Sequence, residues 1–433
     1  MSEQKSYEKG EYPSLKEKRD AFRNQYVQAL ISGEEKRYQM PQLSLQERER
    51  RWNSVRQKMA QRGLDCLIVH GDSGKYDSMM ANIRYLTHIG GHGEEGYAVF
   101  PLQGEVTVFI VYLSIWWMTA QNWVTDVRTG PPSWSKSLAT CVQEKGLESR
   151  KIGLVGMGSM QGYGGLSEGR FPLGVYNRLH ELLPHATFVP ADDILEEMRL
   201  IKSAEEISCH EKAAVMGDAA VRAMATAAKP GIKEYQVYSR VIESMMDLGS
   251  EHPVMFHWEA GSRVHHAGKF PAWRALEPGD VIVNEISPRY CGYWAHPHQP
   301  MSVGKPAPIY LELFKVLLEG FHAGFEAMKP GNSLQDVDRA YMGPILKNGY
   351  DFLHPCIHGL GLALPEFPFT RMHDLPELVP DDEMRIQPGM VFAYEPMICT
   401  SDQRIGIPLG DTVVIEEKGA RRLSTRELEF IIA

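Results

Sequence analysis

One carboxylate and two imidazoles stand close together in the segment 277–303. Glu285 ends a short apolar run, and a turn and an aromatic run then lead to His296 and His298. Because residues two apart in a strand share one face, both imidazoles are expected to point the same way. The segment is therefore a candidate for proton transfer or metal binding.

Two further residues of these types lie downstream, His358 in the motif IHGLGL and Glu395 in the motif PGMVFAYEPM. Together with His296 they offer two neutral imidazoles and one carboxylate. That set would suit a single Zn, Mn or Fe ion with open coordination positions. The alternative is a pocket without metal, in which His296 only forms hydrogen bonds. The sequence predicts one divalent ion or none.

His265 and His266 are the candidate general bases, since imidazole titrates near neutral pH. The alternative for both is an exposed loop, and the sequence does not choose between the two. Glu285 would cost several kcal/mol to bury alone. It is expected to bind a metal ion, to pair with Arg289 or a histidine, or to hold a cationic substrate.

Aromatic residues flank these positions. Trp258 and Trp294 are candidates for a wall around an apolar or cationic substrate, together with Trp273 and Tyr293. The alternative for such residues is a place in the core.

The elements that must position these side chains follow an α/β pattern. A helix is predicted over 44–63, where Ser44 and Glu47 form a capping box. Strands alternating with helices then indicate an α/β domain. The predicted strands of this half are 65–70, 97–101, 106–112, 151–155 and 187–190.

The second half repeats a pattern of two helices followed by strands, which indicates a weak internal duplication. The helices are expected at 204–228, 234–248, 308–328 and 333–348, and the strands at 253–258, 281–286 and 290–294.

The length of 433 residues predicts more than one domain. A polar arm over 1–44, a first domain over 45–200 and a second over 201–433 are expected. The arm is either loosely held or docks on a second subunit.

The net charge of −9 gives no general attraction to nucleic acid or to anionic lipid. Six scattered cysteines suit a reducing compartment. No apolar run is long enough for a signal or a membrane span. We expect a cytoplasmic protein that binds neither nucleic acid nor membranes.

The chain resembles the pita-bread superfamily of methionine aminopeptidase, prolidase, aminopeptidase P and creatinase, over roughly 45–433. The resemblance implies a creatinase-type N-terminal α/β domain and a pita-bread catalytic domain. It rests on an ordered series of motifs, which are RGLD (62–65), NIRYLT (82–87), RLIKSAEEI (199–207), EPGD (277–280), HGLGL (358–362), QPGMVF (387–392), EP (395–396) and GDTV (410–413).

Peptidases of this superfamily bind two metal ions through two aspartates, one histidine and two glutamates. The resemblance places Glu285 and His296 at the aspartate positions, His358 at the histidine position and Glu395 at the first glutamate position. The second glutamate, which bridges the two ions, is replaced by Gly410. A site with two ions is therefore not expected.

Two other positions differ. Relatives place substrate-contacting groups near His298. Pro365 stands where the peptidases carry a second histidine, and Glu366 follows it. His298 and Glu366 are thus candidate substrate-binding residues, and peptide cleavage is disfavoured.

The substitutions resemble the site patterns of creatinase and ectoine hydrolase. The sequence therefore predicts a homodimeric hydrolase of a non-peptide C–N bond in a small cationic or zwitterionic nitrogen compound. A histidine would act as general base, and Glu285 and Glu395 would hold the substrate. The alternatives are a prolidase-type metallopeptidase for Xaa-Pro dipeptides, a lyase of the same fold, and a non-catalytic binding module.

Overall fold

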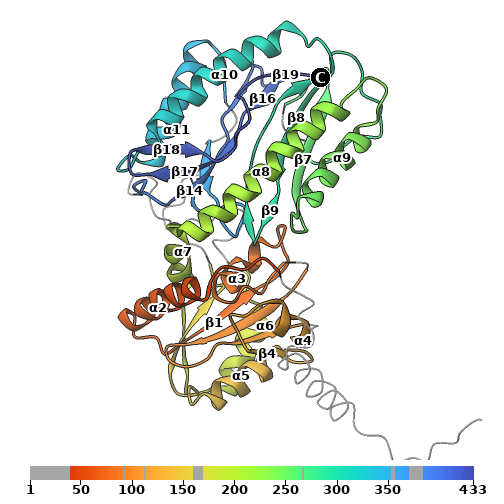
Figure 1. Ribbon diagram of the computed structural model, residues 1–433. Helices are drawn as coiled ribbons and strands as arrows, with labels where there is room; N and C mark the ends of the chain where they lie inside the picture. Colours follow the sequence, from red (N-terminus) through yellow and green to blue (C-terminus); the bar gives the residue numbers. More distant parts are fainter. Residues whose placement is uncertain are drawn as a thin grey trace, which may run out of the picture.

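The computed structural model describes residues 40–91, 93–111, 114–158, 169–265, 268–352, 356–369 and 384–433. The predicted N-terminal arm lies almost wholly outside these residues. Figure 1 shows two bodies, a smaller one formed by the first part of the chain and a larger one formed by the rest. The fold is mixed α/β, as the sequence predicts.

The smaller body is built on a six-stranded sheet in the order β4-β3-β2-β1-β5-β6. β1 runs antiparallel to β2 and parallel to β5, so the sheet is mixed. Every residue of β1 and β2 is buried, because helices cover both faces of the sheet. Its strands are β1 (Cys66–Gly71), β2 (Gly96–Pro101), β3 (Thr107–Ile110), β4 (Asp126–Thr129), β5 (Lys151–Val155) and β6 (Thr187–Pro190).

The helices of this body include several that the sequence pattern does not reveal. α2 (Leu45–Gln61) begins at the predicted N-cap Ser44, whose Oγ accepts a hydrogen bond from Glu47 N. The segment after β1 forms the short helix α3 (Ala81–Thr87). The remaining helices are α4 (Ser114–Ala120), α5 (Trp134–Glu144), α6 (Leu173–Leu182) and α7 (Asp192–Leu200).

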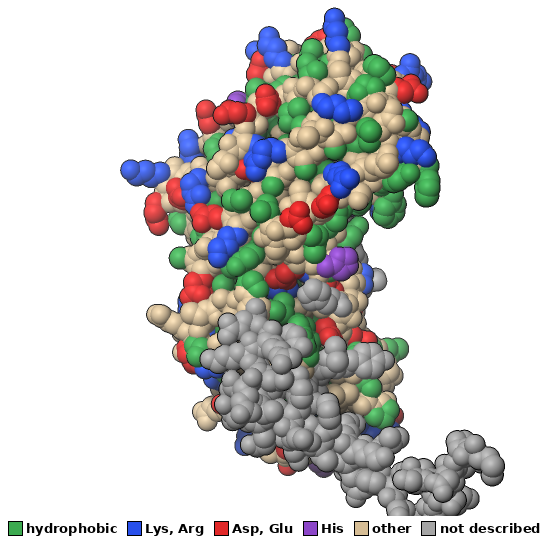
Figure 2. All heavy atoms as spheres, turned by 45° about the vertical axis from the view of Figure 1, so that its right-hand side comes forward, with side chains coloured by type: hydrophobic (Ala, Val, Ile, Leu, Met, Phe, Trp, Pro, Cys, Tyr) green, Lys and Arg blue, Asp and Glu red, His purple; other side chains and the backbone are tan. Residues whose placement is uncertain are grey.

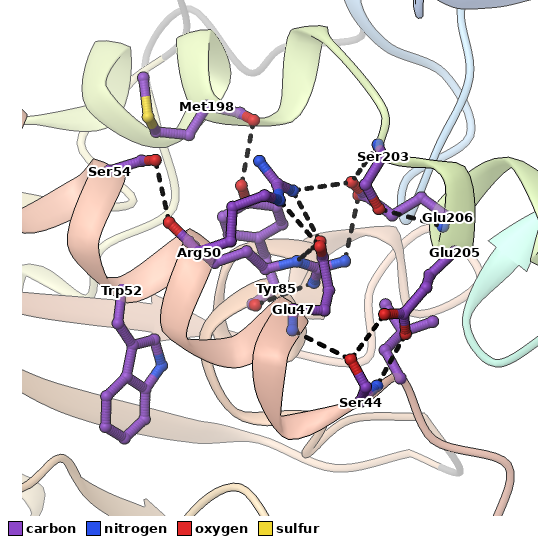
Figure 3. Close-up of polar contacts among 12 residues, drawn as sticks. Ser44, Glu47, Arg50, Trp52, Ser54, Tyr85, Met198, Ser203, Glu205 and Glu206 are labelled. Carbon is purple, nitrogen blue, oxygen red and sulfur yellow. Dashed lines mark hydrogen bonds and ion pairs between the residues drawn. The ribbon is translucent and has the colours of Figure 1, made fainter.

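A three-residue linker joins α7 to α8 (Ala204–Ala227), the long helix that crosses the larger body in Figure 1. Ser203 and Glu206 form a capping box at the start of α8. Figure 3 shows how the starts of α2 and α8 meet. Ser44 donates through N and Oγ to the carboxylate of Glu205, at 2.7 and 2.5 Å. These hydrogen bonds join the start of α2 to the start of α8 and so connect the two bodies.

The larger body carries two main sheets behind two pairs of helices (Figure 1). One sheet has the strand order β19-β11-β8-β7 and the other β13-β12-β14-β17-β18. The helices are α8, α9 (Glu234–Asp247), α10 (Pro308–Ala327) and α11 (Leu334–Lys347). The strands of the sheets are β7 (Met255–Gly261), β8 (Val281–Ser287), β11 (Met301–Ser302), β12 (Ile357–Gly359), β13 (Glu366–Phe369), β14 (Val391–Tyr394), β17 (Asp411–Glu416), β18 (Gly419–Arg422) and β19 (Ile431–Ile432).

The two halves of this body repeat one another. Each has a helix pair, a Pro-Gly turn and a central strand, β8 in one half and β14 in the other. The turn glycines Gly279 and Gly389 have φ of 91° and 86°, a region that glycine adopts without strain. Glu285 lies six residues after Gly279, and Glu395 lies six residues after Gly389. The two candidate carboxylates are thus equivalent residues of a repeated unit.

The expected single strand over 290–294 is instead a hairpin of β9 (Arg289–Tyr290) and β10 (Tyr293–Trp294). Cys291 and Gly292 form its turn with φ of 51° and 86°. This turn reverses the chain just before His296. Two further strands, β15 (Met397–Cys399) and β16 (Gly406–Pro408), form a separate pair. Among the described residues, no helix is both long enough and apolar enough to cross a membrane.

Candidate active site

The strands of both halves bring the candidate side chains to one place. Glu285 lies on β8, and His296 and His298 lie in the segment that follows the β9–β10 hairpin. His358 lies on β12, and Glu395 directly follows β14. Two groups of three residues could each hold a metal ion, since the ligand atoms within each group lie within 4.8 Å of one another. One group is Glu285, His296 and His298, and the other is His296, His358 and Glu395.

Three of these atoms form a nearly regular triangle. Nε2 of His296 lies 3.1 Å from Oε2 of Glu395 and 3.0 Å from Nε2 of His298. Nε2 of His298 is in turn 3.3 Å from Oε2 of Glu395. Nε2 of His358 approaches the other carboxylate oxygen, Oε1, at 3.4 Å. Glu395 therefore stands at the centre of three imidazoles.

The cluster is closed on one side and open on the other. The side chains of His296 and His298 are 3% and 0% exposed, whereas that of Glu285 is 19% exposed. Glu285 Oε2 lies 3.0 Å from Nδ1 of His257, which is also partly exposed. His257 and Glu285 are direct partners across β7 and β8. Their pair forms the open edge of the cluster.

The ionisation states in the cluster depend on one another. Burial alone would raise the pKa of Glu395, but His358 and His296 hold that pKa well below its ordinary value. Burial alone would lower the pKa of His296, but Glu395 raises it. At His358 burial dominates and lowers the pKa. At neutral pH Glu395 is thus an anion and His358 a neutral base.

The hydrogen bonding of His358 tests whether the cluster fits a metal ion. Its Nδ1 lies 2.8 Å from the carbonyl oxygen of Gly359, which can only accept, so Nδ1 carries the ring proton. Neutral His358 then turns the lone pair of Nε2 toward Glu395 Oε1. Two acceptors at this distance repel unless a cation or a proton lies between them. The donor set of imidazoles and carboxylates therefore fits a divalent ion.

The Gly410 position is the place where the chain lacks a side-chain ligand. It forms an isolated antiparallel bridge with His298, and N donates to O in both directions at 3.1 Å. A Cβ atom built on Gly410 would lie 2.9 Å from Cγ of His298. The imidazole of His298 therefore fills the space in front of this glycine.

Several predicted site residues lie elsewhere. Trp258 is buried in the core cluster behind β7 and donates from Nε1 to Glu234 at 2.9 Å. Trp294 is fully buried and donates to the carbonyl oxygen of Leu362. Neither indole forms a substrate wall, because both are packed in the hydrophobic core. A place in the core was the alternative expected for these residues.

Glu366 is engaged in a buried ion pair with Arg199 and Lys202, so it is not free to bind a substrate. His265 is half-buried and its backbone N lies 3.3 Å from Glu259. Within the described part of the chain, Nε2 of His265 is buried and has no hydrogen-bond partner. His266 lies outside the described residues.

Two contacts of the cluster are not evident from the sequence. His257 reaches Glu285 through the register of β7 and β8, a signal that strand pairing alone reveals. Oγ of Ser287 lies 2.7 Å from Nδ1 of His296 and fixes that ring. Of the two pairing partners expected for Glu285, Arg289 or a histidine, the structure shows the histidine, His257. Arg289 is buried beside Asp77 and Glu251.

Two family models together match most of the chain, including the segments that carry this cluster. Residues 208–417 match the model described as metallopeptidase family M24, and residues 51–201 match the creatinase/prolidase N-terminal domain. The Xaa-Pro dipeptidase of Pyrococcus horikoshii is 30% identical over 267 residues, which cover 61% of this chain and 74% of that protein. The chain belongs to metallopeptidase family M24. The predicted pita-bread family is thereby confirmed.

Other M24 relatives agree. The Xaa-Pro dipeptidase of Pyrococcus furiosus is 30% identical over 250 residues, or 56% of this chain and 68% of that protein. The crystal structure of an X-Pro aminopeptidase from Thermotoga maritima MSB8 has a TM-score of 0.74 at 20% identity, covering 88% of this chain and 99% of that one. That structure shares the fold.

The M24 relatives correct the sequence-based function. Their names are those of dipeptidases that act on peptide bonds, so the predicted hydrolysis of a non-peptide C–N bond is wrong. The prediction gave too much weight to Gly410 and Pro365, because it treated each lost family residue as a lost function. A metallopeptidase family implies a divalent ion, and the cluster offers ligand groups for one.

Proposed function

We propose that the protein is a metal-dependent dipeptidase that cleaves Xaa-Pro dipeptides. The observation that carries the proposal is the convergence of three imidazoles and two carboxylates in a chain whose relatives are named Xaa-Pro dipeptidases. His296, His358 and Glu395 would hold the ion. A divalent ion in such a site supplies Lewis-acid polarisation of the peptide carbonyl and acidifies water.

The protein's own side chains would bind the substrate, transfer protons and exclude water. The Glu285 carboxylate stands at the open edge, where Oε2 can accept a proton or hold the amino group of a dipeptide. His257 Nδ1 lies 3.0 Å from that oxygen and can take over the proton. The buried imidazoles of His296 and His298 keep bulk water away from the closed side.

Charge balance favours one ion over two. The family's four carboxylates carry four negative charges, which two divalent ions neutralise. Here only Glu285 and Glu395 remain, and their two charges match one divalent ion. His296 cannot bridge a pair of ions either, because Nε2 of an imidazole has a single lone pair. We assign one Zn, Mn or Fe ion.

The first prediction is that Ala-Pro is hydrolysed only when a divalent ion is supplied. Chelation should abolish turnover, and Zn²⁺, Mn²⁺ or Fe²⁺ should restore it. Glu395→Gln removes an anionic ligand and should lower metal affinity by more than the roughly 10–100-fold that loss of an outer partner costs. Glu416→Gln, on an exposed pair with Arg421, is the matched control. Turnover that survives full chelation would contradict the proposal.

The second prediction is a homodimer with a small peptide as its only other partner. On the face in Figure 2, Lys and Arg side chains are interspersed with Asp and Glu over the larger body, and no basic patch forms there. That distribution and the net charge of −9 disfavour binding to nucleic acid. Light scattering at micromolar concentration should give twice the mass of 48.9 kDa. A single-chain mass would rule out the dimer.

A further inference from the structure

We infer that His298 is a metal ligand that takes over the place of the acidic side chain missing at position 410. The inference rests on the proposed metal-dependent function and adds a ligand that the family pattern does not contain. Three observations support it, the space around Gly410, the backbone that fixes His298, and the triangle of ligand atoms.

The space around Gly410 explains why a glycine stands there. The φ angle of Gly410 is not in the positive range, so its backbone conformation does not require glycine. A Cβ atom would lie 2.9, 3.1 and 3.1 Å from Cγ, Cβ and Cδ2 of His298, closer than real Cβ contacts allow without a shift. The glycine is therefore needed to make room for the imidazole. The imidazole of His298 thus occupies the space that an acidic side chain at position 410 would need.

The backbone holds His298 rigidly in that place. The two hydrogen bonds of the His298–Gly410 bridge are both 3.1 Å long. Arg426 donates to the carbonyl oxygens of Gly410 and His298, and its Nε donates to Gln299 Oε1 at 3.0 Å. The ring of His298 is fully buried. A ligand fixed in this way loses little conformational freedom when an ion binds.

The triangle of His296, His298 and Glu395 is better satisfied by a cation than by protons. Each Nε2 can carry one proton and the carboxylate carries none, so protons can satisfy two of the three edges at most. One cation attracts all three atoms. Ligand atoms about 2.0–2.1 Å from a tetrahedral ion are about 3.3–3.4 Å apart. The observed edges of 3.0, 3.1 and 3.3 Å are close to that spacing.

The consequence is a ligand set of two imidazoles and one carboxylate on a single face, His296, His298 and Glu395. Zn sites with two histidines and a glutamate, and Fe sites with two histidines and a carboxylate, share this composition. These three atoms join His358, the third residue of the proposed site, whose Nε2 lies 3.4 Å from Oε1 of Glu395. Glu285 stands at the open edge, where a substrate can bind.

The test measures Zn²⁺ binding by titration calorimetry and elemental analysis, and the visible spectrum of bound Co²⁺, in the full chain. The wild type should bind one ion. His298→Ala should lower affinity for Zn²⁺ by more than about 100-fold, beyond the loss expected for an outer partner. It should also change the Co²⁺ spectrum. Unchanged affinity and spectrum in this variant would overturn the inference.

Position 410 supplies the matched variants. In the His298→Ala background, Gly410→Glu should restore affinity, because the vacated space admits a carboxylate, whereas Gly410→Gln should not. Equal recovery with both would overturn the inference. Gly410→Ala in the otherwise wild-type chain displaces the imidazole and should lower affinity, but should have no further effect once His298 is alanine. Circular dichroism establishes that each variant is folded.

Failure of this inference and failure of the proposed function give different results. A wild type that binds one ion through His298 but leaves Ala-Pro intact overturns the dipeptidase and keeps the ligand. A wild type that cleaves Ala-Pro, with Zn²⁺ affinity unaffected by His298→Ala, overturns the ligand and keeps the dipeptidase.

Discussion

At the scale of single residues, the hydroxyl of Ser287 decides how His296 presents its ring. Oγ lies 2.7 Å from Nδ1 and can accept the proton of that nitrogen, which leaves the lone pair on Nε2 facing Glu395. Ser287→Ala should therefore lower metal affinity by roughly 10–100-fold, the usual cost of losing such an orienting partner. Ser302→Ala is the control, since that buried hydroxyl bonds Gly304 O instead. Equal affinities in both variants would contradict the role of Ser287.

The sequence revealed most members of the cluster but not the roles of all of them. Glu285, His296, His358 and Glu395 could be found because polar residues interrupt apolar strands and family motifs. The position of His298 in front of Gly410 could not, because the two are far apart in sequence and meet only through strand pairing. For Trp258 the sequence left a substrate wall and the core as alternatives, since alternation along β7 does not say which face is the core.

At the scale of elements, Glu366 joins β13 to Arg199 of α7 and to Lys202 of the linker that follows α7. Burial alone would raise the pKa of Glu366, but Arg199 and Lys202 lower it to about 2. A carboxyl with a lowered folded-state pKa stabilises the fold above its unfolded pKa, and this stability disappears as the pH falls from about 4.5 toward 2. The ion pair thus makes the wild type sensitive to acid.

Glu366→Ala leaves two buried cations unpaired, so it should lower the free energy of unfolding at pH 7 by about 3–5 kcal/mol. The difference from wild type should shrink as the pH falls toward 3. Urea unfolding followed by fluorescence at several pH values measures both effects. Glu416→Ala, in an exposed pair, should change stability little. A difference that stays constant with pH would show that the charge of Glu366 is not responsible.

The helices of the larger body were the most predictable elements, because α8, α9, α10 and α11 have long apolar patterns bounded by Pro-Gly turns or caps. The β9–β10 hairpin was not predictable as such. Its turn needs positive φ at Cys291, and cysteine carries no sequence signal for that conformation.

At the scale of the whole molecule, Arg51 joins the two bodies. It lies fully buried on α2, where it contacts Glu47 at 2.7 Å and Glu206 of α8 at 3.2 Å. Its Nη2 also donates to the hydroxyl of Tyr293, in the hairpin that leads to His296, at 2.7 Å. The smaller body is thus bonded to the hairpin that precedes His296 and His298.

Glu47 and Glu206 each pair with both Arg50 and Arg51, and of these two cations Arg51 is the fully buried one. Arg51→Met removes it, so the two bodies should no longer unfold together. Calorimetry should show one transition in the wild type and two in the variant. Arg56→Met is the control on the same helix, because Arg56 donates hydrogen bonds to the carbonyl groups of Pro101 and Gly104, both in the smaller body. A single transition in Arg51→Met would mean that apolar contacts suffice to couple the bodies.

The unequal exposure of the cluster determines the side from which a substrate can reach it. Among the described residues, the side chains of His257 and Glu285 are 22% and 19% exposed. On the opposite side His298 is fully buried, and Arg426 donates a hydrogen bond to the carbonyl oxygen of Gly410. In the proposed dipeptidase reaction, a peptide would reach the cluster across this edge, and its two amino-acid products would leave across the same edge. Product and substrate would then compete for the same position. Product inhibition that excess substrate relieves is therefore the expected kinetic behaviour.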